Sequence, residues 1–295
     1  MKWLKFLLVL CFLFFGLETA RALDWQKLHQ EAGLDNLQQA EDFFRNNPES
    51  LEGQYVLGLV YLNRHRDQEA NQIFSGMLEL NPDLIGPQWG QAEVLRREAK
   101  FLASEKILRE LIETDPDFSP AYISLAYIKY TQLDFKQAVK LARKVIRQGQ
   151  DSVDLPNYTR AYLINGGSRG MLAYYGGPLA KIRYGTSVFP NLKKAQKLMP
   201  KSPAVLFGLG SFYFLSPKII GGNLDKAQKY LQETIAIDPQ FADAYVRLAQ
   251  VYKAKGDSAK YDLYMQQALS IDPDNILASD EQSGECKFIC LSVKE

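Results

Sequence analysis

Prolines recur at the ends of helix-forming stretches with a period of thirty-four residues. Pro82 and Pro116 follow two such stretches in the contexts ELNPD and ETDPD, and Pro239 and Pro273 follow another two as AIDPQ and SIDPD. A period of this length is typical of a helix–turn–helix repeat, in which each unit buries its apolar face only by stacking on its neighbours. The sequence therefore predicts a row of stacked helical pairs.

Small apolar residues repeat with the same period when positions are counted back from each proline. They let the first helix of a unit approach the second closely, and they are Gly58, Ala92, Ala126, Gly210 and Ala249. Large apolar residues follow at helical spacing. Proline disfavours helical backbone in the residue before it, so each second helix must end there. The alternative is an unrelated helical bundle with coincidental prolines.

This pattern resembles the tetratricopeptide repeat (TPR). The resemblance implies an all-α fold, a right-handed superhelical solenoid of helix–turn–helix units with a degenerate glycine-rich middle. We expect three units in residues 51–151 and two in 203–273, the first of these with a loop insertion, SPKIIGGN. Two capping helices are expected in 23–50, a degenerate basic helical unit in 152–202, and a flexible C-terminal tail in 274–295.

The N-terminal residues have the features of a secretory signal peptide. Lys2 and Lys5 precede an uncharged apolar run over residues 6–17, and Ala20 and Ala22 supply small residues at a cleavage site. We expect residues 1–22 to be removed after Ala22 and the protein to be exported, most simply to the periplasm of a Gram-negative bacterium. A retained N-terminal anchor is the alternative, although the run is short for a bilayer span.

The sequence contains no pattern typical of an enzyme. It has two histidines and no clustered Cys and His, so no catalytic residues, metal site or cofactor are expected. After removal of the signal peptide only Cys286 and Cys290 remain. They either form a disulfide or lie in a loosely ordered tail, and they are too few for structural zinc. A formal net charge of +1 argues against general nucleic-acid binding.

The middle of the chain has an uneven charge distribution. From Leu155 to Leu224 there is no Asp or Glu. The predicted basic patch consists of Arg169, Lys181, Arg183, Lys193, Lys194 and Lys197. Such a patch suits an anionic ligand, an acidic partner or lipid headgroups. Alternatively it is a solvated face whose cations pair with Asp151, Asp154 and Asp225.

Three glycine pairs lie in the same stretch. Because glycine readily adopts positive φ, each pair is predicted to mark a turn or a helix end. The pairs are Gly166–Gly167, Gly176–Gly177 and Gly221–Gly222. None precedes the Lys-Ser/Thr pair of a phosphate-binding loop.

In proteins that resemble this family, the first helices line a concave groove. The matching positions form an aromatic and aliphatic set: Tyr55, Leu59, Leu62, Trp89, Tyr127, Tyr130, Phe207 and Phe214. The carboxylate clamp of the co-chaperone subgroup is absent. An apolar groove suits a hydrophobic or amphipathic peptide, or an apolar small ligand. Burial of several of these rings by the unusual middle segment is the alternative.

Two functions follow as hypotheses. The first is an exported TPR scaffold that binds a partner protein or peptide through the aromatic groove, with no membrane span in the mature chain. The second is a periplasmic solute-handling accessory that binds an apolar small ligand and works with a transporter's substrate-binding subunit. It rests on a looser resemblance to TPR accessory components of tripartite uptake systems, which implies possible oligomerisation.

Overall fold

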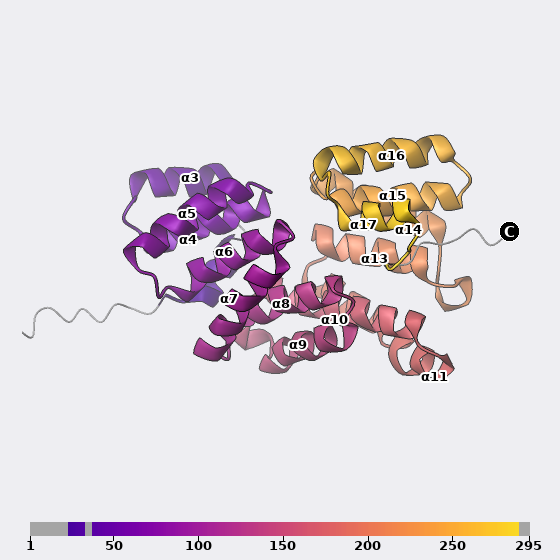
Figure 1. Ribbon diagram of the computed structural model, residues 1–295, viewed down its shortest axis with the longest axis horizontal. Coiled ribbons are helices and arrows are strands. Elements are labelled where there is room, and N and C mark those ends of the chain that lie inside the picture. Colours follow the sequence, from indigo (N-terminus) through magenta and orange to yellow (C-terminus); the bar gives the residue numbers. More distant parts are fainter. Residues whose placement is uncertain (1–22, 33–36, 289–295) are drawn as a thin grey trace, which may run out of the picture.

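The computed structural model describes residues 23–32 and 37–288, and every regular element there is a helix. The helices pack consecutively into a curved row, from the indigo N-terminal pair to the yellow C-terminal helices (Figure 1). This confirms the expected all-α solenoid. Residues 1–22, predicted to be a signal peptide, lie outside the described part of the chain.

Helical pairs with short turns make up most of the chain. The N-terminal helices are α2 (Trp25–Ala32) and α3 (Leu37–Asn46). Three pairs follow: α4 (Leu51–Asn63) with α5 (Asp67–Leu80), α6 (Ile85–Arg97) with α7 (Phe101–Thr114), and α8 (Ser119–Thr131) with α9 (Phe135–Gln148). Two more pairs lie beyond the middle: α13 (Pro203–Leu215) with α14 (Leu224–Ile237), and α15 (Ala242–Ala254) with α16 (Ser258–Ile271).

Close approach of helices explains why the repeat needs small residues. Phe74 on α5 is fully buried against both α4 and α6. A Cβ atom at Gly58 would lie 2.5 Å from the Phe74 ring, and one at Gly90 would lie 2.4 Å from it. Both distances are far below van der Waals contact, so this ring fits only because the two facing positions have no side chain.

The repeat extends to the backbone of the turns. His65, Ala99 and Leu133 hold equivalent places in the turns of the first three pairs, and all have positive φ, between 56° and 64°. Gly256 holds the matching place in the last pair, with φ 83°. Left-handed backbone is costly for residues with a Cβ atom, so three of these four turns carry conformational strain that glycine avoids.

The middle of the chain departs from the pairs. A long helix, α10 (Leu155–Tyr175), is followed by the short α11 (Pro178–Ala180), one π turn (Lys181–Gly185) and α12 (Val188–Leu198). The prediction that Gly166–Gly167 marks a turn was wrong, because both residues lie inside α10. Gly166 is there for packing: a Cβ atom would lie 3.1 Å from that of Asn191 on α12.

The C-terminal residues also differ from expectation. Residues 276–283 form α17 (Ile276–Ser283), which packs on α15, and Phe288 is buried in the core of the last units. The expectation of a flexible tail was therefore wrong for residues 276–288. This helix covers the face of α15 that the last repeat leaves open. Cys286 is disulfide-bonded, whereas Cys290 lies outside the described residues.

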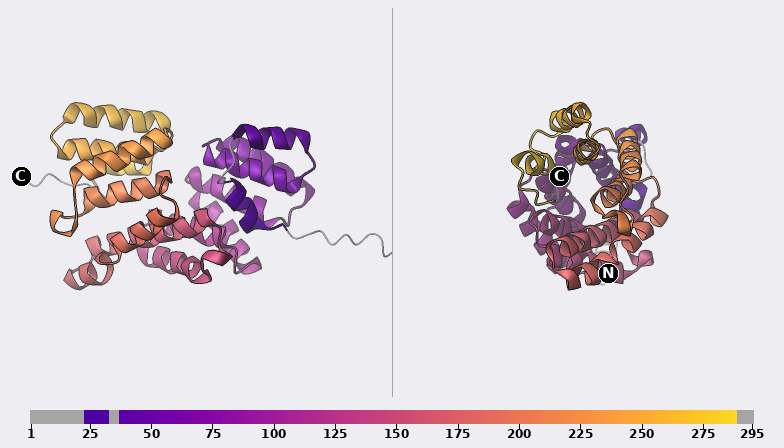
Figure 2. Two further views of the ribbon diagram at one scale, coloured as in Figure 1. Left: turned by 180° about the vertical axis from the view of Figure 1, so that it is seen from behind. Right: turned by 90° about the vertical axis from the view of Figure 1, so that its right-hand side faces the viewer.

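The solenoid curves enough to bring an early turn into contact with a late helix end. Figure 2 (right) looks along the long axis and shows the helices arranged around it. His65, in the turn between α4 and α5, lies 3.1 Å from a carboxylate oxygen of Asp238 at the end of α14. The first and fourth regular pairs are thus in direct contact, although they are far apart in the sequence.

Candidate binding surfaces

The N-terminal half of the predicted groove is filled by the protein itself. Helix α2 packs against α4 and α10, on the side of the first helices that faces the axis, which we call the inner face. The His29 ring nitrogen Nε2 lies 3.0 Å from the Tyr55 hydroxyl, and its ring stands edge-on to Trp89 at 4.8 Å. Trp25 stands edge-on to Tyr55 at 4.9 Å. These aromatic rings form a core.

Only one of the eight predicted groove residues remains exposed. Those that are buried are Tyr55, Leu59, Leu62, Trp89 and Phe214. Tyr130 and Phe207 are half-buried and pack on Phe135 and Phe241 respectively. The prediction of an open groove was therefore wrong at these buried positions. Tyr127 alone keeps an exposed ring, with 40% of its surface accessible.

The Tyr127 ring belongs to a chain of polar contacts along the inner face. The Trp89 indole donates to the Ser124 hydroxyl (3.0 Å), which donates to Glu93 (2.8 Å). Arg96 donates two hydrogen bonds to the Glu93 carboxylate, at 2.6 and 3.0 Å. The Arg96 guanidinium then stacks over the Tyr127 ring, 4.3 Å from its centre. Bidentate pairing and stacking hold both groups in place.

Several ionisable groups on the inner face have shifted pKa values. Burial opposes ionisation of Glu93, but the charge and hydrogen bonds of Arg96 outweigh it and lower the pKa of this carboxyl. Burial, and then the charge of Asp243, raise the pKa of Tyr127 to about 12. Burial also raises the pKa of Asp243, on α15. The charge of Arg96 on α6 is among those that oppose this rise, so charged groups on α6 and α15 act on each other.

Arg160 on α10 has an unusual environment. It lines a small cavity of about 30 Å³ together with His29, Glu93 and Arg97. Burial lowers the pKa of the Arg160 guanidinium, and the charge of Arg97 adds to this effect. Within the described part of the chain, Arg160 makes no hydrogen bond or ion pair. A half-buried cation without an ion pair among the described residues makes this part of the inner face favourable for an anionic group.

The predicted basic patch lies on α10, the π turn after α11, and α12. Its exposed members are Lys181, Arg183, Lys193, Lys194 and Lys197. Arg169 is half-buried and donates to the Ser187 hydroxyl (2.7 Å), which ties α10 to the start of α12. The proposed acidic partners are used elsewhere, since Asp154 accepts two hydrogen bonds from Asn157 and Asp225 pairs with Lys255 at 2.6 Å.

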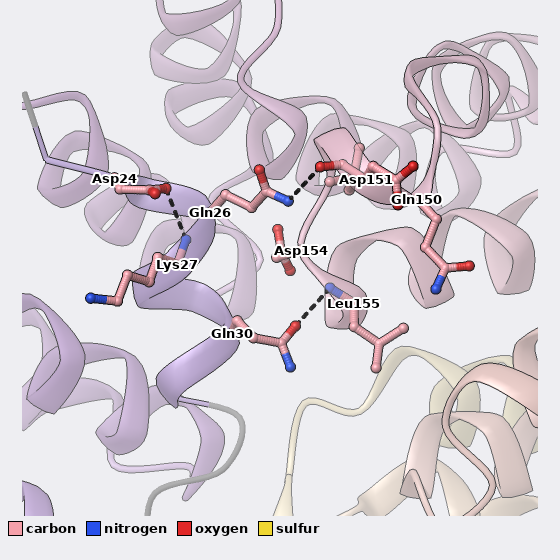
Figure 3. Close-up of a pocket in the computed structure, with 9 residues that line it drawn as sticks. Asp24, Gln26, Lys27, Gln30, Gln150, Asp151, Asp154 and Leu155 are labelled. Carbon is pink, nitrogen blue, oxygen red and sulfur yellow. Dashed lines mark hydrogen bonds between the residues drawn. The ribbon is translucent and has the colours of Figure 1, made fainter.

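A polar cavity lies between α2 and the connection from α9 to α10 (Figure 3). It holds about 540 Å³. The Gln26 amide donates to the Asp151 carbonyl (3.3 Å), and the Gln30 side chain accepts from the Leu155 amide (3.1 Å). Amide and carboxylate groups along its wall do not suit an apolar ligand.

No helix in residues 23–32 and 37–288 combines the length and apolar character that crossing a bilayer requires. Nor do three His, Cys, Asp or Glu side chains in this part of the chain lie close enough together to hold a metal ion.

The sequence did not predict which residues cover the inner face or place charge on it. His29 and Trp25 belong to a short helix without repeat spacing, and nothing in their order places them on α4 and α6. Arg160 lies in the degenerate unit, where no repeat register is defined. The amphipathic pattern of residues 25–32 was a usable signal, because its apolar face requires a partner.

Comparisons with known proteins agree with this architecture. A family model for the tetratricopeptide repeat matches residues 242–275. TTC0263, a TPR protein of Thermus thermophilus, is similar in structure over 68% of this chain and 97% of its own, with 15% identity and a TM-score of 0.55. A TPR protein of Parabacteroides merdae is similar over 87% and 96%, with 13% identity and a TM-score of 0.52.

A monomeric mutant of IFIT1 with Gppp-AAAA is similar over 85% of this chain and 58% of its own, with 18% identity and a TM-score of 0.56. At these identities the likeness concerns the fold alone. No curated protein matches the chain. The matched repeat, the period of the prolines and the stacked helical pairs lead to one conclusion: this chain contains a tetratricopeptide repeat at residues 242–275 and has the fold of a TPR-like helical solenoid.

Proposed function

We propose that the protein is an exported scaffold that binds a partner protein or peptide on the open part of its inner face. The observation that carries the proposal is the exposed Tyr127 ring, held by Arg96 in an otherwise closed interior. Tyrosine and arginine are enriched among the residues that dominate binding energy, and a side chain already held in position loses little entropy on binding.

The charges around Tyr127 favour a partner segment with polar and acidic groups. Arg160 and Arg97 lie near the N-terminal end of this surface, and Asp243 faces it from α15. This differs from the apolar groove expected from sequence, because the apolar positions are occupied by α2. The fold is typical of scaffolds without enzymatic activity.

Cross-linking in the producing cells tests this proposal. A photoreactive phenylalanine at position 127 is expected to capture a partner that the same group at position 102, on the outer side of α7, does not capture. Tyr127→Ala should then weaken binding of that purified partner by about tenfold or more, as for a typical dominant contact. An identical adduct from both positions, or equal affinity of parent and variant, would contradict the assignment.

Export is a separate part of the proposal. It rests on the charge and hydropathy pattern of residues 1–22, and the mass of the mature N-terminus tests it. A chain that starts at Leu23 supports export with cleavage. A chain that starts at Met1 supports a retained anchor.

The solute-handling alternative has one candidate site, the cavity of Figure 3. Its polar wall favours a polar solute over the apolar ligand first expected. Native mass spectrometry separates the two functions: a small bound mass favours solute handling, and a protein companion favours the scaffold.

A further inference from the structure

Exposed aliphatic side chains gather on two short segments of the basic stretch. On α11 and the π turn after it, Leu179 is 84% exposed and Ile182 is 68% exposed. In the loop between α13 and α14, Ile219 is 94% exposed and Ile220 is 59% exposed. Single exposed apolar residues are ordinary on a protein surface, but two such pairs on protruding segments are not.

The loop after α13 holds its isoleucines outward. A Cβ atom at Gly222 would lie 1.8 Å from the carbonyl oxygen of Ser216, so only glycine fits there, and Gly221 has a φ of +108°. The Gly222 amide donates to the Pro217 carbonyl (3.0 Å), and the Asn223 amide donates to the Tyr213 carbonyl (2.8 Å). These contacts close the loop, so the exposure of its tip is part of the fold.

The segment after α10 is shaped in a similar way. A Cβ atom at Gly176 would lie 2.2 Å from that of Ala180 and 2.7 Å from the carbonyl oxygen of Leu172. The missing side chain lets the chain fold back sharply after α10. Tyr174 and Tyr175, just before this turn, are also about half exposed. Figures 1 and 2 show this segment and the loop after α13 protruding at the same end of the molecule.

Cations accompany the aliphatic residues on both segments. Lys181 and Arg183 flank Ile182, and Lys218 precedes Ile219. None of the nine cations between Leu155 and Leu224 has an ion pair among the residues that the structure describes. Elsewhere such pairs are common, for example between Lys129 and Glu105 at 2.7 Å. The surface is therefore complementary in charge to an external anion.

We propose that this end of the molecule docks on an anionic lipid bilayer. The aliphatic tips would enter the boundary between headgroups and acyl chains, and Lys181, Arg183 and Lys218 would lie against the lipid phosphates. Tyrosines at this level are typical of membrane interfaces. A planar bilayer suits these two separate protrusions better than an apolar protein partner, which requires a continuous patch or groove. The inference goes beyond the proposed function and uses a different surface.

Vesicle binding by the purified protein tests the inference. The parent is expected to sediment with vesicles of phosphatidylcholine that contain about one third phosphatidylglycerol, and to bind less at high salt because the charges are screened. The double variant Lys181→Gln/Arg183→Gln should lower the partition coefficient about tenfold or more. Leu179→Ser/Ile182→Ser should weaken binding similarly, whereas Leu102→Ser, at an 84% exposed site on α7, should not.

Tryptophan fluorescence is a second readout, which locates the membrane contact whether or not residues 1–22 are retained. Tryptophan at position 219 is expected to be quenched by lipids brominated in their acyl chains, and tryptophan at position 102 is not. Failure of the parent to bind, equal binding of all variants, or equal quenching at both positions would overturn the proposal. Unchanged circular dichroism confirms that each variant is folded, and a failed result here leaves the role of Tyr127 untouched.

Discussion

The three regular units in residues 51–148 and the basic stretch in residues 155–224 are both built from packed helices, but they differ in which side chains remain exposed and charged. In the regular units most inward side chains other than Tyr127 are buried by packing, and buried charges such as Glu93 are paired. In the basic stretch the helices still pack, through Leu192, Leu209 and their neighbours, but its cations have no acidic partner among the described residues, and aliphatic tips face solvent. The residues packed into the core and the residues that give the surface its charge thus lie in different parts of the solenoid.

The largest expected effect tests how tightly the regular units are packed. Phe74→Ala should lower the free energy of unfolding by about 3 to 5 kcal/mol, because it leaves a cavity against α4 and α6 that rigid helices fill poorly. Phe43→Ala, at a ring that is 51% exposed, should cost far less. Urea unfolding followed by circular dichroism measures both. Similar losses would mean that the units pack more loosely than described.

A pH titration tests whether α2 is a true part of the core. Burial lowers the pKa of His29, so the neutral ring is the stable form in the folded protein. The unfolded chain then binds the proton more readily, and stability should fall as pH drops below about 6.5, by at most about 1.4 kcal/mol per pH unit. The loss continues until the pH passes the lowered pKa of the folded state.

His29→Gln should remove this dependence between about pH 7 and 5, since glutamine has no proton to gain. The check is the free energy of unfolding of parent and variant at each pH. An equal slope in both proteins would mean that α2 leaves the inner face readily, and the Tyr55 and Trp89 surface would become available for binding again.

Matched lysine substitutions compare the two regions directly. Lys129 and Glu105 pair at 2.7 Å with both side chains only 15% exposed, so Lys129→Gln should cost about 1 kcal/mol. Lys194→Gln in the basic stretch should change stability by less than about 0.5 kcal/mol, because no ion pair is lost. Thermal unfolding of the two variants measures the difference. A comparable loss for Lys194 would point to a structural role for the basic stretch.

Reciprocal substitutions in the turns have the smallest expected effect. Gly256→Ala should destabilise by about 1 kcal/mol, since a Cβ atom there meets no neighbour and the cost is purely conformational. Ala99→Gly, at the equivalent place, should stabilise by about 0.5 kcal/mol or be neutral, although substitution by glycine usually destabilises a protein. Opposite signs in chemical denaturation would confirm the backbone equivalence, and a loss in both would contradict it.

The solenoid was predictable because its determinants are local and repeated. Three features determine it: the position of the prolines, small residues such as Gly58 or Ala92, and the spacing of apolar residues. Each acts over one or two turns of helix, so each can be recognised in the sequence directly. The candidate site was less predictable. Tyr127 was predicted together with seven residues at matching positions of the repeat. Repeat position alone does not distinguish the exposed ring of Tyr127 from the ring of Tyr55, which another helix covers.

The sequence by itself determined the repeat, the all-helical architecture and the absence of acidic residues from the basic stretch. Only the tertiary structure decided that α2 fills the inner face, that His65 reaches Asp238, and that Arg160 lies near Glu93 without pairing. The physical reason is the range of the contacts. Repeat spacing follows from the geometry of neighbouring helices, whereas the curvature that brings distant units together accumulates from small rotations along the whole stack.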